Sequence, residues 1–335
     1  MENDLAALYR KIDNLTAIAR GFQGAVVLST AASLELFTLL DKEPLGADEV
    51  ASSLGLDPRA TEIFLHALAG MGLLETGSGR FSNSELASEL LVRGRPYFQG
   101  DIIAHSGNLI SRWVQLPRVL ETGRPAEGPR SVDDKTLWRN FILGMSNTAG
   151  LSAQKVARNI DLGNYRRMLD LGGGPGTYAV HFCRINPNLS AVVLDLPEVI
   201  DEITSGQVKE AQLDKRISFI KGDYLKVDFG SGYDLVFISN IIHSLSGEGN
   251  RLLLRRSFSA LEHGGRIIVK DFLLDEDRIN PPHSSMFAVN MLVGTSSGGC
   301  YTASEVKSWL DDAGFSYERQ VDLTPQARMI IAVKP

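Results

Sequence analysis

The stretch that most constrains the fold is MLDLGGGPGTYAV, at residues 168–180. Its apolar beginning predicts a buried parallel strand, which meets four glycines and a proline before a helix begins near Thr177. Glycine adopts backbone angles closed to other residues, and the helix start presents unpaired N–H groups at the positive end of its dipole. The stretch therefore predicts a ligand site, for a group that carries a carboxylate or a phosphate.

The next strand indicates what the ligand is. The run LSAVVLDL ends at Asp195, where a carboxylate can accept hydrogen bonds from both hydroxyls of a ribose. The ligand is thus predicted to be a nucleoside cofactor, and two candidates remain. Counted from Gly174, the glycines fit the weaker form of the dinucleotide pattern G-x-G-x-x-G, with Ala179 in the third place. Counted from Asp170, they form D-x-G-x-G-x-G, which is typical of S-adenosylmethionine sites.

Strands and helices alternate through the rest of the chain. The predicted strands are MLDL, LSAVVLDL, ISFIKGD, YDLVFISN, GGRIIVKDFLL, FSYERQVDL and ARMIIAVKP. This alternation predicts an α/β fold with a doubly wound sheet. Ligands of such sheets lie outside the carboxyl ends of the strands, which nominates the glycine run, Asp195, Asp223, residues 239–244 and Asp271.

The same rule selects one histidine of six. His243 directly follows the fourth predicted strand and so borders the ligand cleft, which makes it the candidate catalytic residue; the alternative is a purely structural histidine. The other five are His66, His105, His181, His263 and His283. His66 and His105 lie in the N-terminal third, and His181 lies inside the helix after the glycines. His263 lies at the opposite edge of the predicted sheet, and His283 is in a loop that the pattern does not place.

The N-terminal third predicts a winged helix. A helix over residues 47–54 is followed by one over 58–74, with Asp57 as N-cap and Pro58 as first residue, and then by a hairpin with Gly77 and Gly79 at its tip. Between Leu45 and Arg93 there are seven acidic residues and three arginines, which argues against DNA binding and leaves dimerisation as the favoured role. The linker ETGRPAEGPRS separates the two predicted domains, 1–125 and 126–335.

Composition excludes several classes of protein. The net charge of −6 favours neither nucleic acid nor an anionic membrane as a partner, and no segment approaches the length of a membrane span. Cys183 and Cys300 are too few for a disulfide framework and lack metal-ligand spacing, so we expect no metal and a cytoplasmic location. The N-terminus is charged and periodic, unlike a signal peptide.

The segments LDLGGGPGTYAV, VVLDLPEVI, KGDY, SNIIHS and GGRIIVKDFLL, in this order behind a winged helix, resemble the S-adenosylmethionine-dependent O-methyltransferases. The branch is the one that contains plant caffeic-acid-type enzymes and bacterial antibiotic, carotenoid and tetrapyrrole methyltransferases. The resemblance implies S-adenosyl-L-methionine as cofactor, a seven-stranded class I methyltransferase (Rossmann-like) sheet, and a homodimer formed through the N-terminal domain.

The resemblance also implies roles for single residues. His243 matches the general base, and Asp271 matches the carboxylate that orients it. Residues expected to contact the cofactor are Gly172, Gly174, Asp195, Asp223, Tyr224 and Ser239. Met145, Asn290 and Met291 match substrate contacts, and Phe141 lies on the same helix face as Met145, a face that either packs in the core or covers the cleft. The implied reaction takes a proton from a hydroxyl of a small metabolite while the methyl group is transferred in line.

Two departures from the family pattern leave alternatives open. The family often follows its histidine with Asp-Trp, where this chain has Ser244 and Leu245, and Cys300 occupies the place of a second carboxylate. The acceptor is therefore predicted only as an aromatic, polyketide-like, isoprenoid or tetrapyrrole compound of secondary metabolism. The alternatives are a carbon or nitrogen acceptor on the same scaffold, an NAD(P)-dependent oxidoreductase, and a winged-helix transcription regulator.

Overall fold

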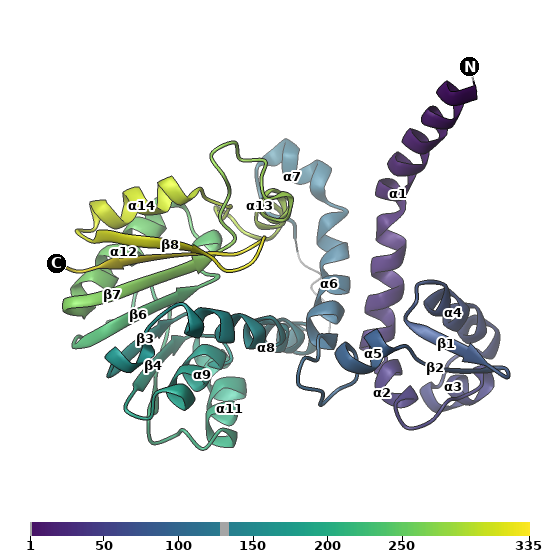
Figure 1. The fold of residues 1–335 in the computed structure, drawn as a ribbon, viewed down its shortest axis with the longest axis horizontal. Coiled ribbons are helices and arrows are strands. Elements are labelled where there is room, and N and C mark those ends of the chain that lie inside the picture. Colours follow the sequence, from purple (N-terminus) through teal and green to yellow (C-terminus); the bar gives the residue numbers. More distant parts are fainter. Residues whose placement is uncertain (1, 128–133) are drawn as a thin grey trace. The chain divides into compact units, whose positions relative to one another are not determined.

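The computed structural model describes residues 2–127 and 134–335, and the side chains of 2–4 and 134–137 are not described. The chain forms two compact units (Figure 1). The N-terminal unit contains residues 2–110 and 134–147, and the sheet unit contains residues 111–127 and 148–335. Two helices, α6 (Gly100–Trp113) and α8 (Asp134–Arg158), run from one unit into the other.

The N-terminal unit is mostly helical. Its further elements are α1 (Glu2–Ser33), α2 (Leu36–Leu40), α3 (Ala47–Leu54), α4 (Pro58–Gly70), β1 (Leu74–Gly77), β2 (Arg80–Asn83) and α5 (Glu85–Leu90). The expected helices at 47–54 and 58–74 and the hairpin are present as α3, α4 and β1–β2, although α4 ends earlier, at Gly70. Asp57 caps α4 by accepting a hydrogen bond from the backbone N–H of Ala60 at 2.8 Å.

Helix α1 leaves a row of apolar side chains in solvent. The row consists of Leu5, Leu8, Ile12, Leu15, Ile18 and Phe22, each between 49% and 79% exposed. A contiguous exposed apolar surface of this kind is typical of a surface that binds another protein. We call these six residues the α1 stripe.

The sheet unit is built on seven strands in the order β5-β4-β3-β6-β7-β9-β8 (Figure 1). The strands are β3 (Arg167–Leu171), β4 (Ser190–Asp195), β5 (Ile217–Lys221), β6 (Tyr233–Ser239), β7 (Leu261–Asp271), β8 (Ser316–Asp322) and β9 (Arg328–Val333). The first five are parallel, and β9 and β8 are antiparallel to their neighbours. This confirms the predicted doubly wound sheet of seven strands.

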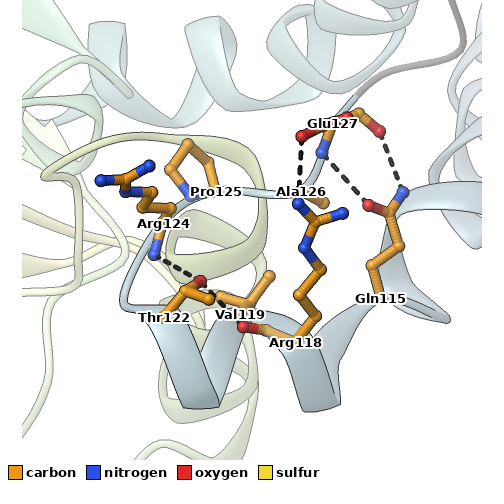
Figure 2. A pocket seen from close by; sticks show the side chains of 8 residues that line it. All are labelled: Gln115, Arg118, Val119, Thr122, Arg124, Pro125, Ala126 and Glu127. Atoms are coloured by element: carbon orange, nitrogen blue, oxygen red, sulfur yellow. Dashed lines mark hydrogen bonds and ion pairs between the residues drawn. The ribbon is translucent and has the colours of Figure 1, made fainter.

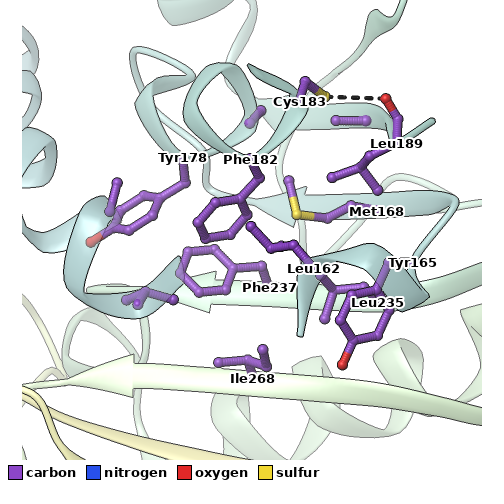
Figure 3. Packing of buried hydrophobic residues seen from close by; sticks show 14 of the residues in the cluster. Leu162, Tyr165, Met168, Tyr178, Phe182, Cys183, Leu189, Leu235, Phe237 and Ile268 are labelled. Atoms are coloured by element: carbon purple, nitrogen blue, oxygen red, sulfur yellow. Dashed lines mark hydrogen bonds between the residues drawn. The ribbon is translucent and has the colours of Figure 1, made fainter. Parts of the chain in front are cut away.

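Both faces of the sheet are covered, which explains why its inner strands β3, β4, β6 and β9 are mostly apolar and buried, whereas the edge strand β8 is polar and mostly exposed. Successive residues of a strand point to opposite faces. Met168 of β3 therefore packs with Phe182, Phe237 and Ile268 on one face (Figure 3), whereas its neighbour Leu169 belongs to the cluster on the other face.

The helices of the sheet unit connect these strands. They are α7 (Leu116–Thr122), η1 (Leu162–Asn164), α9 (Thr177–Ile185), α10 (Pro197–Val199), η2 (Ile200–Thr204), α11 (Ser205–Glu210), η3 (Ile242–Ser244), α12 (Gly247–Ala260), α13 (Pro282–Gly294) and α14 (Ala303–Asp312). Helix α14 begins with a capping box that Thr302 and Glu305 form. Helix α13 was not predicted from the sequence. None of the helices in the described ranges is both long and apolar enough to cross a bilayer.

Candidate active site

The glycine run forms a tight loop between β3 and α9. Gly172, Gly174 and Gly176 have φ angles of 63°, 51° and 78°, in the left-handed region that favours glycine. Space is open beside Gly174, where an added Cβ would meet no atom within 4 Å. The loop thus exposes backbone at the start of α9, where a ligand can approach it.

Two carboxylates flank this loop. Asp195, at the end of β4, accepts the N–H of Gly174 at 2.7 Å and that of Leu196 at 2.7 Å. Asp170, in β3, is fully buried, and its Oδ2 has no hydrogen-bond partner among the described residues. Burial and the nearby charge of Asp195 raise the pKa of Asp170 to about 7. The structure therefore brings Asp195 to the glycine loop, as the sequence predicts.

The loop after β5 supplies two more of the predicted residues. Asp223 accepts the N–H of Leu225 at 2.9 Å, which lowers the pKa of its carboxyl group. The ring of Tyr224 lies against Gly172, and its hydroxyl is 3.4 Å from the Oγ of Ser244. These contacts place Tyr224 between the glycine loop and the segment that carries His243.

His243 lies in η3, shortly after β6. Its ring forms a hydrogen bond with the carboxylate of Asp271 at the end of β7. The distance from His243 Nδ1 to Asp271 Oδ1 is 2.7 Å, and the two side chains are 12% and 2% exposed. Burial would raise the pKa of Asp271, but the charge of His243 and the hydrogen bonds from His243 and the Phe272 N–H outweigh burial and hold the pKa below its ordinary value. The carboxyl group of Asp271 is therefore ionised at neutral pH.

Residues 295–301, which we call the strap, hold the main chain of His243. The N–H of Gly299 donates to the carbonyl oxygen of His243 at 2.8 Å. Gly298 approaches so closely that an added Cβ would lie 2.4 Å from the same oxygen. The hydroxyl of Tyr301 donates to the carbonyl of Leu245. The strap directly follows α13, so it joins that helix to the backbone of His243.

An aromatic cluster surrounds the His243 ring, and the sequence did not predict it. The centroid of the Phe287 ring lies 4.9 Å from that of His243, and the centroid of Phe272 lies 6.2 Å away. His283, which the sequence could not place, begins α13 and lies 5.0 Å from Phe272. Phe287 stands four residues after His283 on the same helix, and this helical spacing was the signal available in the sequence.

The predicted substrate residues lie in both units. Phe141 and Met145 belong to the part of α8 in the N-terminal unit, where the ring of Phe141 lies 5.0 Å from that of His105. Asn290 and Met291 belong to α13 of the sheet unit. Met291 is buried.

Asn290 and Ser239 both belong to the sheet unit. Asn290 accepts a hydrogen bond from the Trp113 indole at 3.0 Å. Ser239 ends β6, and its buried hydroxyl has no partner in the described part of the chain.

A separate pocket of about 580 Å³ lies at α7 and the loop that follows it (Figure 2). Its lining residues are Gln115, Arg118, Val119, Thr122, Arg124, Pro125, Ala126 and Glu127. None of the predicted catalytic, cofactor or substrate residues lines this pocket. In the described ranges, no group of three or more His, Cys, Asp or Glu residues is arranged to hold a metal ion.

Comparison with known proteins identifies the family. The sequence matches the O-methyltransferase domain over residues 128–316 and the O-methyltransferase dimerisation domain over residues 17–93. It is 32% identical to the 3-hydroxy-5-methyl-1-naphthoate 3-O-methyltransferase of Streptomyces sahachiroi, over 95% of this chain and 94% of that protein. It is 31% identical to the tetracenomycin polyketide synthesis 8-O-methyltransferase of Streptomyces glaucescens, over 96% of each protein.

A solved structure agrees with these relatives. Human N-acetylserotonin methyltransferase in complex with S-adenosylmethionine superimposes with a TM-score of 0.87 and 26% identity, over 97% of each chain. The cofactor and the sheet expected from the sequence are therefore confirmed, and the dinucleotide alternative is wrong. The matched dimerisation domain indicates a homodimer. The chain belongs to the S-adenosylmethionine-dependent O-methyltransferases that act on small secondary metabolites.

Proposed function

We propose that His243 is the general base of the methyl transfer and that Asp271 positions it. The observation that carries this proposal is the 2.7 Å contact between His243 Nδ1 and Asp271 Oδ1 at the carboxyl edge of the sheet. Ile241, two residues before His243, packs on Gly172, because an added Cβ there would lie 2.3 Å from Ile241 Cδ1. The base and the glycine loop are thus neighbours.

The ionised carboxylate assigns the roles of the two ring nitrogens. Asp271 can only accept, so Nδ1 of His243 carries a proton and donates it. The other nitrogen, Nε2, is then free to accept the proton of an acceptor hydroxyl. This neutral imidazole nitrogen can take the proton as the new bond forms. Asp271 stabilises the imidazolium that results.

The residues at the sheet edge fit the cofactor, which supplies a methyl group on a positively charged sulfur. We propose that the open backbone beside Gly174 receives the cofactor and that Asp195 accepts from its ribose hydroxyls, because this carboxylate is already fixed at the loop by two N–H groups. Asp223 and Tyr224 would bind at the next strand end, with Gly172 and Ser239 completing the set.

We propose an aromatic hydroxyl compound as the acceptor. The cluster of Phe272, Phe287 and His283 beside the base presents aromatic rings, which pack well on a flat aromatic acceptor. The two Streptomyces relatives are named for a naphthoate and a polyketide substrate, which supports the same class. Phe141, Met145, Asn290 and Met291 remain proposed acceptor contacts.

We propose that residues 1–125 form the dimerisation domain and residues 126–335 the catalytic domain. The α1 stripe supports the dimerisation role of the first domain, because its exposed apolar side chains are suited to pack against a second copy of the chain. The acidic character of the α3–α4 region supports the absence of a nucleic-acid partner. We also propose that the protein acts in the cytoplasm, away from membranes, since both cysteines are free.

Transfer of labelled methyl groups from S-adenosylmethionine into small molecules of a cell extract tests the function. We expect one labelled product with the wild-type protein. His243→Ala should remove the label while S-adenosylhomocysteine still binds, whereas Asp195→Ala should weaken that binding. His263→Ala is the matched control, because its ring bonds only to the carbonyl of Pro335 among the described residues.

The two variants separate the possible failures. Full activity of His243→Ala would refute the general base while leaving the methyltransferase intact. Unchanged cofactor binding by Asp195→Ala would refute the proposed ribose contact. A labelled product whose new methyl group is on nitrogen or carbon would refute the hydroxyl acceptor.

A further inference from the structure

Strand β7 carries a buried lysine that the methyl transfer does not use. Lys270 is 4% exposed and directly precedes Asp271. Its Nζ donates to the side-chain oxygen of Asn240 at 3.0 Å, and no carboxylate of the described residues lies within ion-pair distance of it, although its charge helps to hold the pKa of the neighbouring Asp271 low. A buried charge is costly unless it is paired, so a lysine in this state is suited to receive an anion.

Two polar residues neighbour this ammonium group, and the side chain of one of them lacks a hydrogen-bond partner in the described part of the chain. Ser239 of β6 is the direct register partner of Lys270, and its buried hydroxyl has no hydrogen-bond partner in the described part of the chain. Asn240 has a φ of 57°, and its backbone N–H donates to the carbonyl of Lys270 at 2.9 Å. The ammonium, the amide and the hydroxyl therefore meet at the ends of two adjacent strands.

This group of three lies at the reacting edge of the sheet. The Nζ of Lys270 is 5.7 Å from the centroid of the Phe272 ring, which in turn lies 6.2 Å from the ring of His243. Strand β6 separates β7 from β3, whose end carries the glycine loop. An anion bound at Lys270 would therefore lie close to both the base and the cofactor loop.

We propose that Lys270, Asn240 and Ser239 form a carboxylate-binding site. One cation with two neutral hydrogen-bonding groups matches a singly charged anion. The carboxylate comes either from the methionyl part of the cofactor or from an acidic acceptor. The proposal rests on the proposed function, which places both molecules at this edge.

Binding of S-adenosylhomocysteine to the Lys270→Met variant tests the first source. Methionine keeps much of the length of lysine and removes its charge. If the cofactor carboxylate binds here, the variant should bind S-adenosylhomocysteine about 10- to 100-fold more weakly in calorimetry. Decarboxylated S-adenosylhomocysteine should bind the variant and the wild type with equal affinity. The matched control is Lys334→Met, since Lys334 also lies on a phenylalanine ring, at 4.6 Å, but bonds backbone carbonyls at the opposite edge.

Binding of 1-naphthoate to protein saturated with S-adenosylhomocysteine tests the second source. If the carboxylate belongs to the acceptor, Lys270→Met should weaken the binding of 1-naphthoate by the same factor. The affinity for 2-naphthol, which has no carboxylate, should be unchanged. If the variant and the wild type are alike toward both S-adenosylhomocysteine and 1-naphthoate, the proposal is wrong. A wild-type protein that does not bind S-adenosylhomocysteine at all would refute the proposed function and this site with it.

The melting temperature distinguishes a binding role from a structural one. If Lys270 binds a ligand carboxylate, its buried charge destabilises the ligand-free protein, so Lys270→Met should raise the melting temperature measured without ligand. The variant should also show a smaller further rise in melting temperature when S-adenosylhomocysteine or 1-naphthoate is added. A lysine that only supports the fold would give a lower melting temperature and unchanged ligand affinities, which would overturn the proposal.

Discussion

Gly298→Ala should slow catalysis, although Gly298 is none of the proposed catalytic, cofactor-binding or acceptor-binding residues. The added Cβ would lie 2.4 Å from the carbonyl oxygen of His243, where ordinary contact begins at 3.4 Å. Relieving the overlap requires a movement of about 1 Å, and such a shift of a catalytic group costs about 10²-fold in rate. We therefore expect kcat to fall by about that factor, with an unchanged dissociation constant for S-adenosylhomocysteine.

The neighbouring residue provides the control. An added Cβ on Gly299 would meet no atom within 4 Å, and alanine keeps the N–H that bonds to His243. Single-turnover transfer of a labelled methyl group to the identified acceptor gives the rate of each variant, and calorimetry and thermal melting show that cofactor binding and folding are intact. If Gly298→Ala and Gly299→Ala transfer methyl groups at rates within about twofold, the strap does not position His243.

Three further predictions concern titratable groups. Asp271→Asn should lower kcat by about 10²-fold with unchanged binding of S-adenosylhomocysteine, because it removes the carboxylate that fixes His243; a pH–rate profile identical to that of the wild type would contradict this. The raised pKa of Asp170 makes the folded protein lose stability as pH rises from the unfolded value toward about 7. Melting temperatures between pH 5 and 8 should therefore fall less in Asp170→Asn than in the wild type, and parallel curves would exclude the effect. Burial raises the pKa of Cys183 to about 11 and of Cys300 to about 12, so neither should react with iodoacetamide at pH 8 until the protein unfolds; rapid labelling of the native protein would refute this.

The sheet could be predicted because the residues that signal each strand and its end lie within that strand or directly after it in the sequence. Buried parallel strands are mostly apolar, and six of the seven end beside glycine, proline or charged residues that mark a turn, whereas β6 runs into Asn240 and Ile241. The rule that ligands bind at carboxyl strand ends then brought His243, Asp271 and Asp195 to one edge, where the structure places them.

Helix boundaries in the N-terminal unit were less predictable. The run AASLELFTLL at residues 31–40 is compatible with one continuous helix, but in the structure α1 continues to Ser33 and α2 begins only at Leu36. Glu35 between them has a φ of 54°, a left-handed conformation that ends one helix and redirects the chain into the next. Such a break in a glutamate has no sequence signal, because its side-chain contacts with Arg93 and Thr38 come from the tertiary structure.

The surroundings of the base could not be predicted for a different reason. The four-residue spacing of His283 and Phe287 fits a helix, but the polar residues of α13 do not gather on one face and so give no amphipathic pattern, and its contacts with η3 join residues some forty positions apart. That His283 and Phe287 lie near His243 could therefore be found only from the structure. The contact of the strap also depends on the structure, because the sequence does not show that Gly298 lies close to the carbonyl oxygen of His243.

The strap also constrains how such an enzyme can change its substrate during evolution. The helix that bears Phe287, a proposed acceptor contact, and the carbonyl of His243 are joined by a short, hydrogen-bonded connection. Substitutions that reshape α13 for a new acceptor are transmitted to the base through the same backbone. A lineage that acquires a new acceptor would therefore need compensating changes in residues 295–301, and grafting α13 alone between relatives would produce a folded but slow enzyme.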